Sequence, residues 1–223
     1  MKVDPVLDEP RVSDAGSNAL APQAPQMSGR FVQLRPITPA DYGPLYKIAI
    51  SEEVNLRWRF RGIVPSFEAF SNAFRPADVT AQFAITTRQN DEAQGLVVAY
   101  NTDPRDTHTY VGTFVSPKLA GTGLGVEATS LFATYLFMTW PFRKVYFEVI
   151  EYNLSSFKMA LHDLFRVEGH LVDHLYYGGR FWDMLVLALY REDALHFSEA
   201  RRVHRRHASD SAKPPTVKEP QSE

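Results

Sequence analysis

The sequence contains no cysteine among its 223 residues. This absence excludes disulfide bonds, thiolate metal sites and a cysteine nucleophile. The chain also lacks a run of about 18 apolar residues and a positively charged start followed by an apolar stretch, which mark membrane spans and secretory signals. We therefore expect a cytoplasmic protein with no membrane partner.

Aromatic residues are missing from both ends of the chain. All 15 Phe, 10 Tyr and 3 Trp residues lie between Arg30 and Phe197. The N-terminal stretch mixes Pro with Ser, Ala, Gln and Asp, a composition that cannot offset the entropy cost of ordering. The prediction is one α/β domain at residues 30–197, between a disordered tail at 1–29 and a basic, then polar tail at 198–223 that we also expect to be disordered.

An excess of charge is absent as well. The formal net charge of −2 gives no general attraction to nucleic acid. One local basic run, at residues 201–207, is interpreted as a solvated helix end. Salt-dependent nucleic-acid binding through this run is the alternative, which we disfavour.

The first part of the domain predicts a short strand and two helices. Residues Phe31–Leu34 are typical of a strand, and Thr38-Pro39-Ala40-Asp41 is typical of a helix start. Gly43-Pro44 then interrupts or kinks this helix, which we expect to continue to about Glu53. A second helix opens at Ser66, and its aromatic residues share one face: Phe67, Phe70 and Phe74.

The middle of the chain predicts an antiparallel meander followed by a crossover. The meander strands are expected at Phe83–Thr87, Leu96–Tyr100 and His108–Val115. A helix at Val126–Thr139 leads to a strand at Val145–Ile150, and such a connection usually makes a parallel pair. A helix at Ser155–Leu164 follows, and then a hairpin of Val167–Tyr176 and Phe181–Tyr190 that turns at Gly178-Gly179.

Four passages carry a resemblance to a known family. They are Leu34 to Asp41, Ala120 to Ala128 (AGTGLGVEA), Glu148 to Ser156 (EVIEYNLSS), and Glu168-Gly169 with Gly179 to Asp183 (GRFWD). In their order and spacing, the chain resembles the GNAT superfamily of N-acyltransferases, in particular the RimJ/RimL type of ribosomal-protein N-terminal acetyltransferases. The resemblance implies a mostly antiparallel, mixed twisted sheet flanked by helices, with a splayed parallel strand pair that binds the cofactor.

The glycine-rich turn before the long helix is the candidate cofactor site. Unpaired N–H groups and the positive end of the helix dipole attract an anion there, and the resemblance makes that anion the pyrophosphate of acetyl-CoA or another acyl-CoA. The implied cofactor residues are Val115, Gly121, Thr122, Gly123, Leu124, Gly125, Val126 and Asn153. Ala120 departs from the family, which usually has Arg or Gln there, and Leu164-Phe165 replaces its usual Gly-Phe. A glycine turn that only closes tightly on the sheet is the alternative.

Two residues are candidates for catalysis. The resemblance implies that Ser156 protonates the departing thiolate, because Ala160 replaces the Tyr found in other members. Asn153 is alternatively a helix N-cap. Glu148 is the candidate general base, since a carboxylate among apolar neighbours has a raised pKa. The alternative is a Glu148 that pairs with Arg143 or Lys144 or is exposed at the sheet end, and Glu151 is a rival base.

The acceptor side is expected at the segment Arg57-Trp58-Arg59-Phe60-Arg61, whose guanidinium groups suit an anionic acceptor. Trp182 is a further candidate for the wall of the acceptor cleft, although hairpin packing explains it equally. The histidines show no metal-ligand spacing, so no metal is expected.

The leading interpretation is an enzyme that transfers an acetyl or other short acyl group directly from CoA to an amine. The acceptor is an amine-bearing small molecule or a peptide or protein N-terminus, and a monomer and a homodimer both remain open. A catalytically silent acyl-CoA sensor or scaffold is the alternative, which the Ala120 departure permits.

Overall fold

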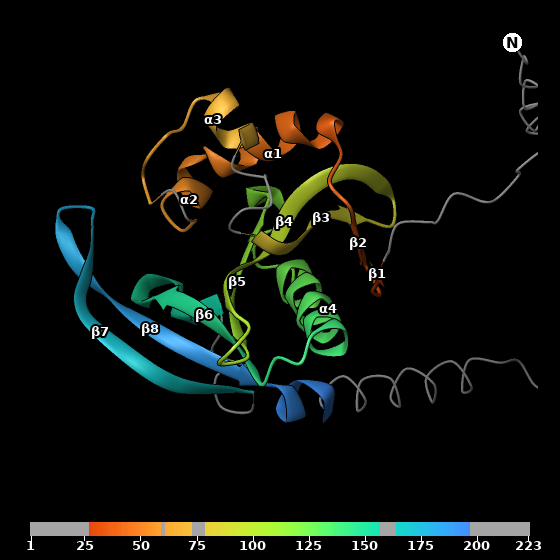
Figure 1. Cartoon of the computed structure of the whole chain (residues 1–223). Helices are drawn as coiled ribbons and strands as arrows, with labels where there is room; N and C mark the ends of the chain where they lie inside the picture. The colour runs from red at the N-terminus through yellow and green to blue at the C-terminus, as the bar shows by residue number, and fades with distance from the viewer. Residues whose placement is uncertain (1–26, 59–60, 73–78, 157–163, 197–223) are drawn as a thin grey trace, which may run out of the picture.

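The computed structural model describes residues 27–58, 61–72, 79–156 and 164–196 (Figure 1). Within these ranges the strands are β1 (Met27–Ser28), β2 (Val32–Arg35), β3 (Val79–Thr87), β4 (Asn90–Asp103), β5 (His108–Val115), β6 (Lys144–Ile150), β7 (Phe165–Tyr177) and β8 (Arg180–Tyr190). The α-helices are α1 (Tyr42–Ala49), α2 (Glu52–Asn55), α3 (Phe67–Asn72) and α4 (Leu124–Thr139), and residues 191–196 are also helical. Short 3-10 turns are η1 (Pro39–Asp41), η3 (Pro117–Leu119) and η4 (Glu151–Ser156).

The strands form one mixed sheet in the order β1-β2-β3-β4-β5-β6-β8-β7. Strands β3 to β5 form the predicted antiparallel meander, β2 adds to it by antiparallel pairing with β3, and β5 agrees with the prediction at both ends. The chain then crosses over through α4 and returns as β6, parallel to β5. This confirms the predicted parallel pair. Met27 and Ser28, which we assigned to the N-terminal tail, pair with β2 as strand β1, so the sheet includes residues before Arg30.

Successive side chains along each strand point to opposite faces of the sheet, and apolar side chains on both faces are buried. Helix α4 covers one of them through Ala128, Phe132 and Leu136, which are buried against the core. Helices α1 and α3 cover part of the other face, where Leu45 and Phe70 are buried (Figure 1). Residues Phe67 and Phe70 both contact the Tyr46 ring, as their predicted common face requires. Phe74 lies outside the described residues.

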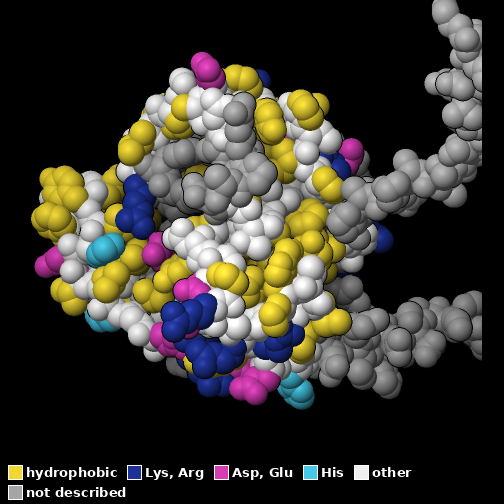
Figure 2. All heavy atoms as spheres, viewed as in Figure 1, with side chains coloured by type: hydrophobic (Ala, Val, Ile, Leu, Met, Phe, Trp, Pro, Cys, Tyr) yellow, Lys and Arg dark blue, Asp and Glu magenta, His cyan; other side chains and the backbone are white. Residues whose placement is uncertain are grey.

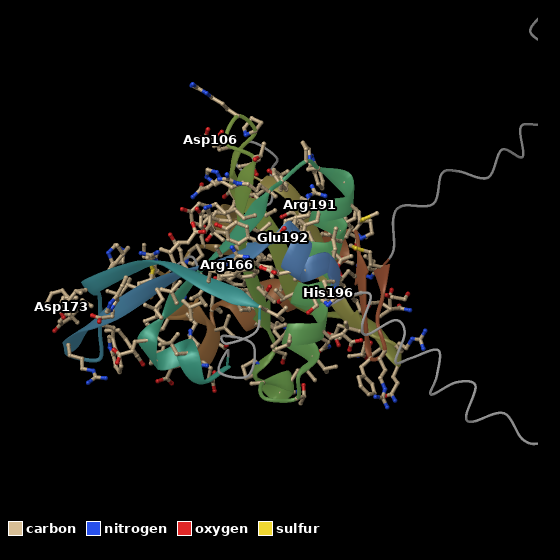
Figure 3. The ribbon with its side chains drawn as sticks, turned by 90° about the horizontal axis from the view of Figure 1, so that it is seen from below. Asp106, Arg166, Asp173, Arg191, Glu192 and His196 are labelled. Carbon is tan, nitrogen blue, oxygen red and sulfur yellow. The ribbon has the colours of Figure 1, made fainter. Side chains whose placement is uncertain are left out.

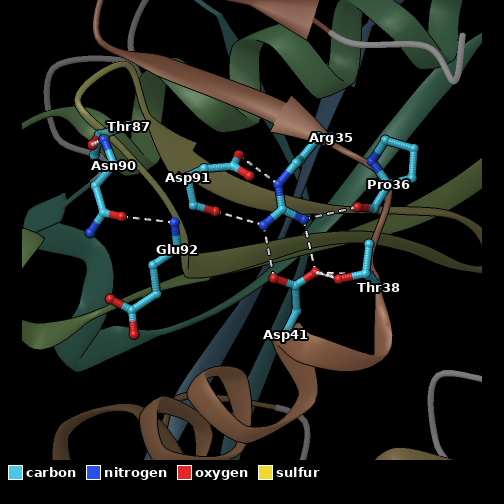
Figure 4. A network of polar contacts seen from close by, with 8 residues as sticks. All are labelled: Arg35, Pro36, Thr38, Asp41, Thr87, Asn90, Asp91 and Glu92. Carbon is cyan, nitrogen blue, oxygen red and sulfur yellow. Dashed lines mark hydrogen bonds and ion pairs between the residues drawn. The ribbon is translucent and has the colours of Figure 1, made fainter.

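The start of the domain is fixed by a polar network around Arg35 (Figure 4). The Arg35 guanidinium donates to both carboxylate oxygens of Asp41, at 2.8 and 2.9 Å, and also contacts Asp91. The hydrogen bond from Arg35, strengthened by those from the Thr38 N–H and hydroxyl, lowers the pKa of Asp41 to about 2 despite its burial. The network therefore joins β2, the η1 turn and the β3–β4 turn.

The first helix differs from its prediction. Gly43-Pro44 do not interrupt α1, because Pro44 falls in the first helical turn, where its missing N–H has no intrahelical acceptor to lose. The helix does not continue to Glu53 either. It ends at Ala49, and α2 begins separately at Glu52 after Ser51.

Strands β5 and β6 pair only at their first residues and then separate. The three pairs are His108 with Lys144, Thr109 with Val145, and Tyr110 with Tyr146. Beyond them, β5 stays paired to β4 as far as Val115, and β6 stays paired to β8 as far as Ile150. The two strands therefore open a wedge in the middle of the sheet, with the facing backbone edges left unpaired along it.

The last two strands form a long hairpin that projects from the body (Figure 1). Its turn is Gly178-Gly179, as predicted, and both residues have positive φ angles of 61° and 81°, which favour glycine. At its base, Arg166 lies beside Glu192 and the helical segment 191–196, whereas Asp173 marks the far end (Figure 3). The predicted helix at Ser155–Leu164 is described only as the η4 turn at its start, and residues 157–163 lie outside the description.

Candidate functional site

A cavity of about 1840 Å³ includes the wedge between β5 and β6, extends past the C-terminal end of α2 to Arg61, and also runs along α4 to Met27 and Leu195. Residues of the predicted site line it: Arg57, Trp58, Val115, Gly121, Gly123, Gly125, Val126, Glu148 and Asn153. Residues from four separate passages of the sequence thus meet at one space: 57–58, 115, 121–126 and 148–153. Ala120, where the resemblance expects Arg or Gln, also lines the cavity and adds no side-chain donor.

The glycine-rich turn delivers the chain to α4 in a conformation that needs glycine. Gly121 and Gly123 have φ angles of 75° and 83°, and Gly123 is the N-cap of α4. A Cβ at either position would meet no atom within 4 Å, so the space outside the turn is open. The N–H groups of Leu124, Gly125 and Val126 belong to the first helical turn and have no intrahelical acceptor, although the Leu124 N–H donates to the Thr122 hydroxyl at 3.5 Å. The turn therefore presents donors, at the positive end of the helix dipole, to an open space.

Two residues of the predicted cofactor set have other contacts. The Thr122 hydroxyl donates to the Leu119 carbonyl at 2.7 Å, which closes the turn. The Leu124 side chain packs against the core cluster on the α4 face of the sheet. Their backbone groups remain part of the turn, but neither residue lines the cavity.

The cleft walls suit a ligand that carries amide groups. Val111 to Val115 of β5 and Phe147 to Ile150 of β6 line the cavity with strand edges that do not pair with each other. Backbone N–H and C=O groups need partners when a ligand excludes water from them. An extended chain with its own amides can supply these partners, as an added strand does.

Glu148 lies at the cavity and is exposed near the end of β6, which is one of the alternatives that we left open. The expected apolar surroundings and the alternative pairing with Arg143 or Lys144 are not what the structure shows. The Arg61 guanidinium donates to Glu148 Oε2 at 3.3 Å, and both side chains are partly exposed. Lys144 pairs with Glu168 at the opposite end of the strand.

Tyr152 joins the cofactor side of the site to the acceptor side. Its hydroxyl donates to the Leu56 carbonyl at 3.2 Å, and its ring contacts Tyr177 and Trp182 of the hairpin. Burial raises the pKa of Tyr152, and the positive charges of Arg57 and Arg61 oppose this only in part. The hydroxyl therefore remains a donor at neutral pH. We did not single out Tyr152 as a site residue, although it stands in the Glu148 to Ser156 passage that we quoted, whereas Arg61 belongs to the segment that we assigned to the acceptor side.

The aromatic candidates divide into one that lines the cavity and one that does not. Trp58 is buried and packs edge-on against Phe114 with 4.6 Å between ring centroids, and it also forms part of the cavity wall. Trp182 does not line the cavity. Its Nε1 donates to the Tyr177 carbonyl at 3.0 Å, so hairpin packing accounts for it.

Two predicted residues fall partly or wholly outside the described part. The Ser156 backbone ends the η4 turn, but its side chain is not described. Arg59 lies outside the described residues. Asn153 lies in the same η4 turn and lines the cavity, three residues from Ser156 along the chain.

A wedge between two parallel strands and a glycine turn with N–H donors thus meet at one cavity, an arrangement that suits an anionic, amide-bearing ligand. The acetyltransferase (GNAT) domain family matches residues 32–162 of the chain. The protein belongs to this family of acetyltransferases and has the GNAT fold. No curated protein matches the sequence.

Solved structures of the same fold include enzymes from several bacteria. The spermidine N-acetyltransferase from Vibrio cholerae, in complex with CoA and spermine, is 18% identical with a TM-score of 0.66 over 74% of this chain and 98% of that one. A GCN5-related N-acetyltransferase from Brucella melitensis is 22% identical with a TM-score of 0.61 over 77% and 81%. An acetyltransferase of the GNAT family from Bacillus anthracis is 16% identical with a TM-score of 0.62 over 75% and 99%. At these identities the structures establish the fold alone.

Among the described helices, none is both long enough and apolar enough to cross a bilayer.

Proposed function

We propose that the protein is an acyl-CoA-dependent N-acyltransferase that transfers an acetyl or other short acyl group directly to an amine. One observation carries this proposal. The first-turn donors of α4 open onto the same cavity as the unpaired edges of β5 and β6. The donors suit the pyrophosphate, and the strand edges suit the two amides of the pantetheine chain. The Vibrio cholerae structure holds CoA within the same fold, which supports this placement.

The residues present fit CoA through backbone donors more than through side chains. Gly121 and Gly123 leave open space for the phosphates, and Ala120 offers no hydrogen bond where Arg or Gln would. Backbone N–H groups at a helix start bind anions without a basic side chain. We propose that Val115, Gly125, Val126 and Asn153 complete the cofactor wall.

The proposed reaction needs a neutral amine and a protonated leaving thiol. The acceptor ammonium loses one proton to Glu148, directly or through water, and the amine nitrogen then attacks the thioester carbonyl. The C–N bond forms, the C–S bond breaks, and the nitrogen loses its second proton to solvent, to which Glu148 also releases the first. The thiolate gains a proton from Ser156, which is replenished from solvent. The net products are an amide, CoA thiol and one proton.

The test is thiol release from acetyl-CoA across a panel of amines, for the wild type and Glu148→Gln. The variant should lose the acidic limb of the kcat/KM profile and recover part of its activity at high pH, where the amine deprotonates unaided. If Glu148→Gln keeps the wild-type limb and rate, Glu148 is structural, and the base is Glu151 or solvent.

A silent acyl-CoA sensor is the alternative, and Ala120 is the feature that favours it. This alternative predicts acetyl-CoA binding by calorimetry without thiol release for any amine. Membership of the RimJ/RimL-like branch is a narrower proposal that rests on the sequence passages, and it predicts acetylation of a peptide N-terminus.

A further inference from the structure

Charged side chains of both signs line the acceptor end of the cavity. They are two acids, Glu53 and Glu148, and two bases, Arg57 and Arg61. The remaining charged residue of the wall, Glu127, accepts the N–H groups of Arg30 and Phe31 and so faces the β1–β2 turn. Basic and acidic side chains lie together between the apolar hairpin tip and the body of the molecule (Figure 2). Among the described residues these charges balance, and they give no net attraction to a polycation or a polyanion.

Within the described residues, Arg61 and Glu148 form the one ion pair among these four. It is a single contact of 3.3 Å, and the side chains are 42% and 30% exposed. Exposed pairs of this kind contribute little to stability. The pair is therefore easily exchanged for contacts with a ligand.

The acceptor has to compete with Arg61 for Glu148. In the proposed reaction the acceptor ammonium faces the Glu148 carboxylate, which now accepts a hydrogen bond from Arg61. A simple amine or a polyamine would take Glu148 and leave Arg61 without its partner, beside Arg57. An acceptor with its own carboxylate would replace the lost ion pair of Arg61, because guanidinium groups bind carboxylates well.

We infer, on the basis of the proposed function, that the acceptor is a small zwitterion with its amine and carboxylate in one molecule, such as a free amino acid. Its ammonium pairs with Glu148 and its carboxylate with Arg61 and Arg57. One protein ion pair is exchanged for two contacts with the acceptor. The Tyr152 hydroxyl donates to the Leu56 carbonyl and so holds the chain just before Arg57 against the η4 turn. This contact sets the distance between the arginine side chains and Glu148.

The experiment compares matched acceptors with acetyl-CoA: the common amino acids, their C-terminal amides, the corresponding decarboxylated amines, and spermine. The wild type should prefer at least one amino acid over its amide and its amine by tenfold or more in kcat/KM. The amine of the amide is no more basic than that of the acid, so easier deprotonation cannot produce the preference over the amide, and this is the deciding comparison. Arg57→Met and Arg61→Met should reduce the ratio of kcat/KM for the amino acid to kcat/KM for its amide towards one, mainly through the acceptor KM. Arg57→Met is the cleaner variant because Arg57 makes no contact with Glu148 that it would break. Arg88→Met, on the exposed β3–β4 turn, is the matched control and should keep the ratio.

Three outcomes overturn the inference. A preference for spermine or for decarboxylated amines refutes the zwitterion while the acyltransferase proposal stands. A preference for acids that survives both arginine substitutions refutes the assigned residues. Absence of thiol release with every acceptor, in a protein that still binds acetyl-CoA, refutes the proposed function itself and the inference with it.

Discussion

The substitution Gly123→Asp tests the phosphate-binding turn most directly. Gly123 is the N-cap of α4 with φ of 83°, and a Cβ there would meet no atom within 4 Å. A non-glycine residue in this conformation costs about 1–2 kcal/mol, which is small beside a total stability of about 5–15 kcal/mol. We therefore expect the variant to fold.

The effect on cofactor binding should be much larger. Each hydrogen bond from an N–H group to a charged phosphate contributes about 1.5–3 kcal/mol. The introduced carboxylate repels the phosphates and competes for the first-turn donors, so the loss of two such bonds amounts to about 3–6 kcal/mol. Since about 1.4 kcal/mol corresponds to a factor of ten, we expect the acetyl-CoA affinity to fall by at least about 100-fold, measured by calorimetry.

Gly178→Asp supplies the matched control. Gly178 also has a positive φ, of 61°, and open space around its Cβ position, but it lies in the hairpin turn and does not line the cavity. The Gly178→Asp variant therefore introduces the same charge and a similar backbone strain as Gly123→Asp, at a place away from the proposed phosphate site. Unchanged acetyl-CoA affinity in a folded Gly123→Asp protein would refute the assignment of the turn. An equal loss in both variants would show that damage to the fold, not the site, had been measured.

Three further predictions follow from other contacts. Ser156→Ala should lower kcat by more than tenfold at unchanged acetyl-CoA affinity, and an effect on affinity alone would make Ser156 a binding residue. Tyr152→Phe removes the hydrogen bond to Leu56 and should raise the acceptor KM about fivefold, the equivalent of about 1 kcal/mol, with the acetyl-CoA KM unchanged. Equal changes in both KM values would contradict this role. Asp41→Asn should destabilise the fold by about 2 kcal/mol at neutral pH, since the pKa of Asp41 lies near 2 against an ordinary 3.8 and each unit is about 1.4 kcal/mol. Because the pKa is lowered, this stabilisation is present above about pH 4 and disappears as the pH falls towards 2, so urea unfolding curves of the two proteins should converge there.

The sequence by itself determined the features that depend on neighbouring residues. The His108–Val115 strand, the glycine turn that opens α4 and the Gly178-Gly179 hairpin turn are all encoded by local patterns, and the structure contains each of them. The parallel pairing of β5 and β6 was also predictable from the sequence, because two strands joined by a crossover helix usually lie parallel in the sheet.

Only the tertiary structure decided which side chains meet at the acceptor end. Arg61 contacts Glu148 across 87 residues, and Tyr152 contacts Leu56 across 96. Both contacts depend on how far β6 diverges from β5 and on where α2 ends, and no local pattern encodes either quantity. The same divergence of β6 from β5 opens the cavity, while hairpin packing keeps Trp182 out of its wall, so the neighbours of Glu148 became known only from the packed sheet.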